Sequence, residues 1–210
     1  MDDTGIVDDL VLTGRYIRLE PLTEAHVPAL AAAAATSRGT YLYSVVPDGP
    51  EATGRYVAEA VAARSDGSQM PFATVRLADG LVVGTTRFQD LEPWVWPTGS
   101  PSQRVDRPDV TEIGHTWLAE TAQRTGINTE AKSLMLHHAF DVWDVHLVRL
   151  RTDRRNVRSR TAIERLGARF EGVRRADRPA IDGSVRDSAF YSITRDEWPE
   201  VRRRLATLLR

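Results

Sequence analysis

The sequence predicts an α/β (α+β) fold in which helices flank a central β-sheet, and three observations support this prediction. Strand-like and helix-like segments follow one another in the order strand, two helices, three strands, helix, strand, helix, two strands, helix. Asp79-Gly80 separates two strand-like segments, which is typical of a tight antiparallel hairpin. Residues 111–118 are strand-like and run through a glycine-containing turn directly into a helix.

The first part of the chain supplies a strand, two helices and a hairpin. Residues 12–19 alternate well enough for a strand, and residues 23–36 are rich in alanine, the strongest helix former. Residues 50–64 carry apolar side chains at helical spacing and predict a second helix. Residues 72–77 and 81–88 predict the two strands of the hairpin.

Residues 92–108 form the one long loop that the sequence predicts, and they contain four of the eleven prolines. Trp94 and Trp96 in this loop leave two interpretations open. They could line a substrate pocket or cover a dimer interface, or they could simply pin the loop to the core. A homodimer is therefore a possible assembly.

The C-terminal part of the chain alternates again between strands and helices. Residues 146–152 predict a strand, and residues 156–166 predict a helix that ends at Gly167. Two strands follow, at 169–173 and 188–194, joined by a polar loop with Asp182-Gly183 as its turn. Thr194 and Glu197 form a capping box that opens a last helix, whose inward face we expect to comprise Trp198, Val201, Leu205 and Leu208.

Composition limits the class of protein. The 210 residues suit a single domain at 11–210 after a flexible leader at 1–10. A net charge of -1 argues against a nucleic-acid binder. The absence of cysteine excludes disulfides, thiolate metal sites and a cysteine acyl-enzyme, and we expect no metal. No apolar run is long enough to span a membrane and the acidic start is unlike a signal peptide, so we expect a cytoplasmic enzyme.

The strand, turn and helix after residue 110 predict a phosphate-binding site. A helix that starts directly after a glycine turn presents unpaired backbone N–H groups and the positive end of its dipole to an anion. The P-loop and dinucleotide-binding patterns are both absent. The turn instead reads Gln123-x-x-Gly126-x-Asn128, followed by apolar residues at helical spacing: Ala131, Leu134, Met135, Ala139 and Val142.

This turn resembles the Q/R-x-x-G-x-G/A pyrophosphate loop of the GNAT superfamily of acetyl-CoA-dependent N-acetyltransferases. The neighbouring segments EIGHTWL and GINTEAK are similar to the RimJ/RimL branch, the ribosomal-protein N-terminal acetyltransferases. The resemblance covers almost the whole chain. It implies the GNAT fold, whose mixed, mostly antiparallel sheet is splayed between the fourth and fifth strands. Asn128 departs from the small residue of the family pattern, although Asn tolerates left-handed backbone angles and caps helices well.

The resemblance also implies acetyl-CoA as co-substrate and a set of residues that bind it. Backbone N–H groups near Trp117 and Leu118 are expected to stabilise charge on the thioester oxygen. Arg124 could pair with the phosphates, and Lys132 could do the same or be a solvated helix residue. The Arg154-Arg155 and Arg174-Arg175 pairs are expected to be solvated loop charges. The expected cofactor-binding residues are Trp117, Leu118, Arg124, Thr125, Gly126, Ile127, Asn128, Thr129, Asn156 and Ser159.

Glu112 is the expected general base. It lies eleven residues before Gln123, the separation between the base and the loop glutamine in histone acetyltransferases of the superfamily. A carboxylate beside a cleft can take a proton from the amine, directly or through water. A purely structural glutamate is the alternative. His115 is the competing candidate, although strand alternation points it to the opposite face from Glu112.

Ser159 is the expected group at the departing thiolate. The family's proton-donating tyrosine would stand seven residues after Asn156, where this chain has Ile163. Ser159 lies one turn earlier on the same face, and it either donates the proton or only contacts the cofactor. Asn156 itself could cap its helix and also bind pantetheine.

These observations predict an N-acetyltransferase that moves the acetyl group of acetyl-CoA to a primary amine by direct attack in a ternary complex. The acceptor could be a protein N-terminus or a small molecule such as an aminoglycoside or a polyamine. A non-catalytic acyl-CoA-binding module is the alternative, because the tyrosine is missing and Asn128 replaces a small residue.

Overall fold

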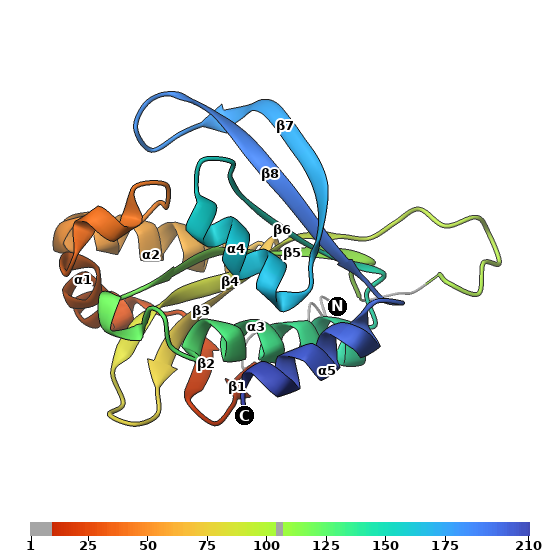
Figure 1. Cartoon of the computed structure of the whole chain (residues 1–210), viewed down its shortest axis with the longest axis horizontal. Helices are drawn as coiled ribbons and strands as arrows, with labels where there is room; N and C mark the ends of the chain where they lie inside the picture. Colours follow the sequence, from red (N-terminus) through yellow and green to blue (C-terminus); the bar gives the residue numbers. More distant parts are fainter. Residues whose placement is uncertain (1–9, 104–106) are drawn as a thin grey trace.

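The computed structural model describes residues 10–103 and 107–210. The predicted leader therefore lies outside the described residues except for Leu10, which packs against the core. Eight strands form one sheet in the order β1-β2-β3-β4-β5-β6-β8-β7 (Figure 1). Their bounds are β1 Leu12–Thr13, β2 Ile17–Pro21, β3 Gln69–Arg76, β4 Val82–Glu92, β5 Val110–Leu118, β6 Leu147–Asp153, β7 Arg169–Pro179 and β8 Val185–Thr194.

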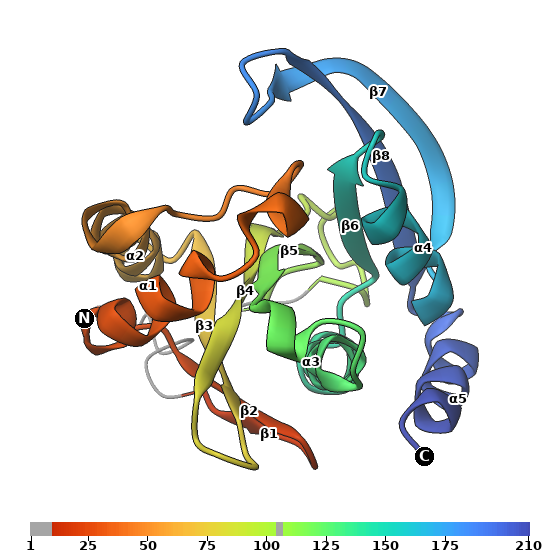
Figure 2. The same ribbon diagram turned by 60° about the vertical axis from the view of Figure 1, so that its left-hand side comes forward.

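Helices cover both faces of the sheet (Figure 2). α1 (Val27–Ala35) and α2 (Gly49–Ser65) pack on one face, and α3 (Ile127–His137) and α5 (Trp198–Leu208) lie on the other. α4 (Val157–Leu166) packs beside β6 and α5. Short helical turns complete the chain at Glu24–His26, Arg38–Tyr41, Glu120–Ala122 and His138–Val142. Within the described ranges, no helix has the length and apolarity that crossing a membrane requires.

The sheet opens between its two parallel strands. All neighbouring strands pair antiparallel except β5 and β6. This pair is joined only at its start, where Val110, Thr111 and Glu112 face Leu147, Val148 and Arg149. Beyond Glu112 the two strands separate. The predicted fold class, with its splayed mixed sheet, is therefore confirmed.

The prediction of one strand at residues 12–19 is wrong, because this segment forms a hairpin of two short strands. β1 pairs with β2, and the chain turns at Gly14, whose N–H donates to the carbonyl of Ile17. Glu130 of α3 organises this turn by accepting hydrogen bonds from the N–H groups of Arg15, Tyr16 and Ile17 at 2.7, 2.7 and 2.9 Å. Because Glu130 is more than a hundred residues away in the sequence, no local pattern in residues 12–19 indicates this turn.

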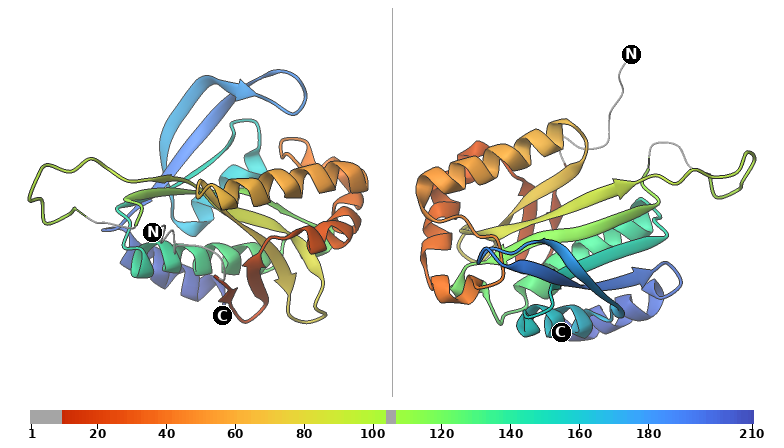
Figure 3. Two further views of the ribbon diagram at one scale, coloured as in Figure 1. Left: turned by 180° about the vertical axis from the view of Figure 1, so that it is seen from behind. Right: turned by 90° about the horizontal axis from the view of Figure 1, so that it is seen from above.

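The last two strands are longer than predicted. The segment expected to be a polar loop is mostly strand, because β7 extends to Pro179 and β8 begins at Val185. Asp182-Gly183 does lie in the turn between them. The outer half of this hairpin rises away from the rest of the sheet (Figure 3), so both of its faces carry polar residues and the period-two signal is lost.

Several helix ends also differ from the sequence prediction. The first helix begins with a separate 3₁₀ turn and ends at Ala35. Half of the capping box is present, since the Glu197 carboxylate accepts from the Thr194 N–H at 2.9 Å while the Thr194 hydroxyl donates to the same carboxylate. Leu208 was expected on the inward face of the last helix, but it is exposed because it lies in the last turn of that helix.

The loop after β4 is fixed at its base. Asp109 accepts hydrogen bonds from the Trp94 N–H at 2.7 Å and from the Trp96 indole at 3.1 Å. The Trp94 ring also stacks on His146, with ring centroids 5.3 Å apart. These contacts favour the interpretation in which the tryptophans pin the loop to the body of the protein.

Candidate active site

A cavity of about 480 Å³ lies where β5 and β6 separate. Its walls come from β5, from the turn before α3, from α4 and from the β7–β8 hairpin. Glu112, Asn128 and Ser159, which the sequence analysis assigned to three different roles, all line it. One space therefore connects the expected base, the expected phosphate turn and the residue expected at the thiolate.

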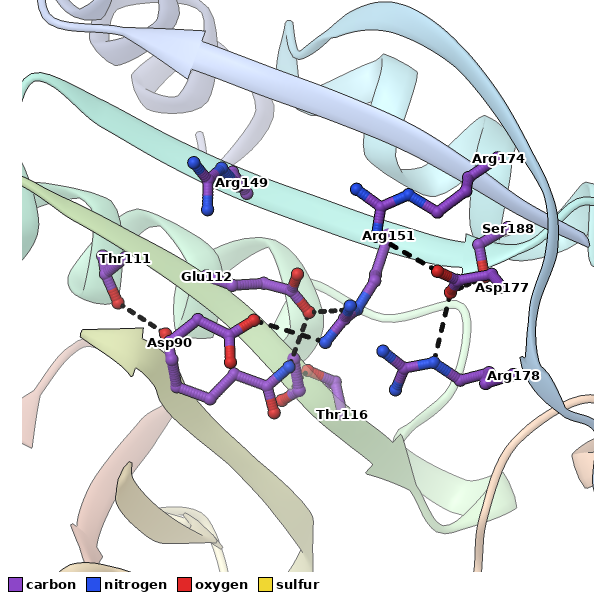
Figure 4. A network of polar contacts seen from close by, with 12 residues as sticks. Asp90, Thr111, Glu112, Thr116, Arg149, Arg151, Arg174, Asp177, Arg178 and Ser188 are labelled. Carbon is purple, nitrogen blue, oxygen red and sulfur yellow. Dashed lines mark hydrogen bonds and ion pairs between the residues drawn. The ribbon is translucent and has the colours of Figure 1, made fainter. Parts of the chain in front are cut away.

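Glu112 is buried at the point where the two strands part (Figure 4). Its Oε1 accepts a hydrogen bond from the Gln89 amide at 2.6 Å and pairs with the Arg151 Nε at 2.9 Å. Arg151 also pairs with Asp90 at 3.3 Å. Gln89 and Arg151 both contact Glu112 through their side chains, and both contact the same carboxylate oxygen.

The surroundings of Glu112 raise its affinity for a proton. Burial raises the pKa of Glu112 above the ordinary value of a glutamate, because a charged carboxylate is poorly solvated there. The Arg151 guanidinium opposes part of this rise by stabilising the charged form. A carboxylate with a raised pKa in a cleft is suited to act as a general base.

The expectation that His115 points away from Glu112 is wrong. Both residues line the cavity, because β5 bulges at His115 and Thr116. His115 has a left-handed φ of 47°, and the register with β4 shifts between Thr85 and Arg87. The cleft walls and the guanidinium groups of Arg87 and Arg151 lower the pKa of His115 to about 3, although its ring remains accessible. The ring is therefore neutral at neutral pH.

The turn before α3 has the geometry of a helix start. Glu130 makes the first hydrogen bond of the helix, to the carbonyl of Gly126 at 2.9 Å, which leaves the amides of Asn128 and Thr129 without an intrahelical acceptor. Arg124, with a φ of 57°, takes the left-handed conformation in this turn. The Gln123 amide donates to the Leu118 carbonyl at 2.8 Å, so this glutamine holds the turn against β5.

The predicted cofactor residues divide into two groups. Seven of them line the cavity: Trp117, Leu118, Arg124, Thr125, Asn128, Asn156 and Ser159. Gly126, Ile127 and Thr129 do not, and they could contribute only backbone groups there. A side chain at Gly126 would press on Tyr16, with its Cβ 3.3 Å from the ring. Ile127 is part of the core, and the Thr129 hydroxyl accepts from Arg165 of α4 at 3.0 Å.

The start of α4 faces the opposite wall of the cavity. The Asn156 side chain caps this helix by accepting from the Ser159 N–H at 3.0 Å. The Ser159 hydroxyl has no hydrogen-bond partner among the residues that the structure describes. Ile163, at the position of the family's tyrosine, is buried and also lines the cavity.

Lys132 is not a solvated helix residue. It is buried beneath the bulge of β5, where its Nζ donates to the Thr86 and Thr116 hydroxyls at 3.1 and 2.5 Å. Burial without a counter-charge lowers the pKa of Lys132 to about 7. The lysine lines the cavity, but its hydroxyl partners hold it against the sheet.

Sequence reasoning missed several residues of this site. Gln89 and Arg151 hold Glu112 from two different strands, and nothing in their spacing to Glu112 indicates this contact. Tyr41, from the turn after α1, donates its hydroxyl proton to the Leu118 carbonyl at 3.1 Å and lines the cavity. Arg158 of α4 reaches across to the Thr40 carbonyl at 2.6 Å.

The residues present fit an acyl-CoA. A helix start with free amides and Arg124 suits the phosphates. Beyond Glu112, the edge of β5 that faces β6 is unpaired, and such an edge suits an extended polar chain. Ser159, with its free hydroxyl, suits the sulfur. In the described parts of the chain, no group of three or more histidine or acidic side chains could hold a metal ion.

Comparison with known proteins identifies the family. The model of the acetyltransferase (GNAT) domain matches residues 17–169, well over half of the chain. A protein from T. thermophilus described as an acetyltransferase is 31% identical, with a TM-score of 0.80, over 98% of this chain and 100% of that one. A GCN5-related N-acetyltransferase from Brucella melitensis is 29% identical, with a TM-score of 0.79, over 97% and 86%.

A more distant neighbour carries a ligand of the expected kind. Mycobacterium smegmatis RimJ, solved in complex with CoA-disulfide, is 21% identical with a TM-score of 0.72, over 96% of this chain and 93% of that one. No curated protein matches the chain. From the family model and the solved structures, the chain belongs to the GNAT acetyltransferase family and is an acyltransferase.

Proposed function

We propose that this protein transfers the acetyl group of acetyl-CoA to a primary amine, in a protein N-terminus or a small molecule, by direct attack in a ternary complex. One observation carries the proposal. Glu112, with its raised pKa, shares a single cavity with the helix start at Asn128 and with Ser159. The proposed base, the proposed phosphate site and the proposed sulfur contact would therefore share one cavity.

In the proposed reaction, Glu112 takes the proton of the attacking amine. An amine is protonated near neutral pH, so the reactive complex needs a proton acceptor. Arg151 and Gln89 fix the orientation of the carboxylate through its Oε1. A neutral His115 in the same cavity could relay this proton through water.

Other groups of this chain act on the thioester. Backbone N–H groups at the end of β5, near Trp117 and Leu118, would donate to the carbonyl oxygen as it gains charge. The Trp117 ring itself packs in the core with α1 and α2, so only its backbone is proposed to take part. The Ser159 hydroxyl would give a proton or a hydrogen bond to the departing thiolate.

A non-catalytic acyl-CoA-binding module is the second candidate. The observation that favours it is Ile163, an apolar side chain at the position of the family's proton donor. Native mass spectrometry for bound coenzyme A, followed by acetylation assays on N-terminal peptides and small amines, separates the two. Binding together with turnover supports the enzyme, whereas tight binding without turnover on any amine supports the module.

Two further features belong to the proposal. We place the protein in the cytoplasm, as an enzyme that draws on cellular acetyl-CoA. A homodimer remains proposed, with the loop that carries Trp94 and Trp96 as its interface, although the internal contacts of both tryptophans also suit a monomer. Size-exclusion chromatography with light scattering would decide the oligomeric state.

A further inference from the structure

Three arginines line the cavity at the end where Glu112 lies. Arg151 comes from β6, Arg178 from β7 and Arg186 from β8. Arg178 points toward the pair of Arg151 and Glu112 (Figure 4). Its charge, like that of Arg151, opposes part of the rise in the pKa of Glu112. A cluster of guanidinium groups therefore surrounds the place where the amine is proposed to lose its proton.

The three arginines do not each have a carboxylate of their own as an ion-pair partner. Arg151 forms ion pairs with Glu112 and Asp90. Arg178 shares the buried carboxylate of Asp177 with Arg174, which does not line the cavity. The Arg186 Nε donates to the Ser188 hydroxyl at 2.9 Å, but over residues 10–103 and 107–210 no carboxylate pairs with its guanidinium.

The register of the hairpin makes this arrangement costly. Arg178 and Arg186 are directly opposite each other across β7 and β8, and like charges at such positions destabilise a sheet. Burial and the charges of Arg178 and Arg151 lower the pKa of Arg186, and the nearby carboxylates of Asp153 and Asp177 offset only part of this effect. An anion in the cavity that both guanidinium groups bind would offset the repulsion between Arg178 and Arg186.

The phosphates of coenzyme A do not account for the cluster. Leu118 lies six positions after Glu112 on β5, which is about 20 Å of strand, and the helix start proposed to hold the phosphates lies beyond Leu118. The pantetheine arm between these points carries no charge. The anion expected at the arginines therefore belongs to the acceptor.

We propose that the acceptor amine carries a carboxylate, which Arg178 and Arg186 bind while Glu112 takes the proton of the amine. This inference rests on the proposed acetyltransferase function and names its substrate class. The carboxylate could be an acidic side chain near a peptide N-terminus or the carboxylate of a small amino acid. A polycation such as a polyamine is a poor match for the same site.

The experiment compares matched acceptors at saturating acetyl-CoA. The peptide pair differs only by glutamate or glutamine at its second residue, and the small pair is β-alanine and β-alaninamide. We expect kcat/KM to be higher for the charged member of at least one pair, on the order of tenfold. The pair that shows the difference identifies the source of the carboxylate.

Variants of the hairpin test whether these arginines cause the preference. Arg186→Gln should reduce the charged-to-neutral ratio to near one, and Arg186→Lys should retain part of it. Arg175→Gln, an equal charge change at an exposed position outside the cavity, should leave the ratio as in the wild type. Because Arg186 faces a like charge, Arg186→Gln should keep or raise the melting temperature, whereas loss of a structural ion pair would lower it.

The outcomes separate this inference from the function on which it rests. Equal or better turnover of both neutral acceptors overturns the inference and leaves the acetyltransferase proposal intact. A preference that survives Arg186→Gln, or that Arg175→Gln removes equally, also overturns it. Absence of turnover on every amine, with acetyl-CoA bound, refutes the proposed function, and the inference falls with it.

Discussion

Two buried glutamates, Glu112 in the cleft and Glu130 in α3, have opposite surroundings. Glu130 accepts three hydrogen bonds from backbone N–H groups of the β1–β2 turn, and a side chain at Gly14 would collide with its carboxylate, the Cβ lying 2.4 Å from Cδ. Glu112 is held by the side chains of Gln89 and Arg151 and lines the cavity.

The difference shows how one residue type serves structure in one place and chemistry in another. The three donors to Glu130 belong to the backbone of the β1–β2 turn and cannot move without unfolding it, so Glu130 serves the fold. Side-chain donors on an open cavity leave a second oxygen for a substrate or water. Glu112 is therefore placed to exchange a proton with a substrate, whereas Glu130 is placed to hold the turn.

The largest expected effect is on turnover at Glu112. Glu112→Gln preserves size and one acceptor oxygen but removes the base, and general-base catalysis contributes about a hundred- to ten-thousand-fold. Turnover in steady-state assays should fall by that amount, while acetyl-CoA affinity by calorimetry stays near the wild-type value. Arg151 keeps Asp90 as a partner, and the melting temperature serves as the control for folding.

Glu130→Gln should have the reverse effect. An amide cannot accept all three backbone hydrogen bonds, and bonds to a charged group contribute about 1.5–3 kcal/mol each, so the variant should lose roughly 2–4 kcal/mol of unfolding free energy. Urea denaturation measures this loss, with Glu200→Gln at an exposed site as the matched control. Unchanged stability would mean that Glu130 does not anchor the turn.

A third change tests the start of the helix that contains Glu130. Asn128→Asp adds a negative charge where phosphate is proposed to bind, and at the first turn of a helix this change does not threaten the fold. Acetyl-CoA affinity should fall about tenfold, as expected for one added like charge in a partly screened site. Equal affinity by calorimetry would move the phosphate site elsewhere.

Ser159→Ala should have the smallest effect. The cap of α4 is kept, because Asn156 bonds to the backbone of residue 159, and a coenzyme A thiolate leaves with modest help. We expect a several-fold effect at most, on the order of 1 kcal/mol for one neutral hydrogen bond. If kcat falls and acetyl-CoA affinity does not, Ser159 is a proton donor; if only the affinity for acetyl-CoA falls, Ser159 is a cofactor contact. If neither quantity changes, Ser159 is not part of the site.

Local patterns in the sequence predicted most of the fold and the position of Glu112. The Asp79-Gly80 hairpin, the glycine turn before α3 and the Asn156 cap are all encoded within a few residues. The sequence did not predict the β1–β2 hairpin, because Glu130 organises it from more than a hundred residues away. Nor did it predict how far β7 and β8 extend toward their turn, because the polar faces of the outer half carry no alternation.

Several residues that line the cavity could be named from the sequence, but their arrangement could not. Strand alternation failed at His115, since a bulge between β4 and β5 brings it to the same cavity as Glu112. Arg178 and Arg186 were indistinguishable from ordinary loop arginines in the sequence. Their register across a hairpin and their position on the cavity wall exist only in the folded chain.

The pH dependence of the Glu112→Gln defect tests the central claim most directly. Since burial raises the pKa of Glu112, wild-type activity should be lost as the pH falls through that raised value, and the variant should lack this loss. The ratio of wild-type to variant kcat/KM should be about a hundred or more at pH 7 and shrink as the pH approaches the pKa of the acceptor amine. A ratio near one at pH 7, or one that does not change with pH, would contradict the assignment of Glu112 as the base.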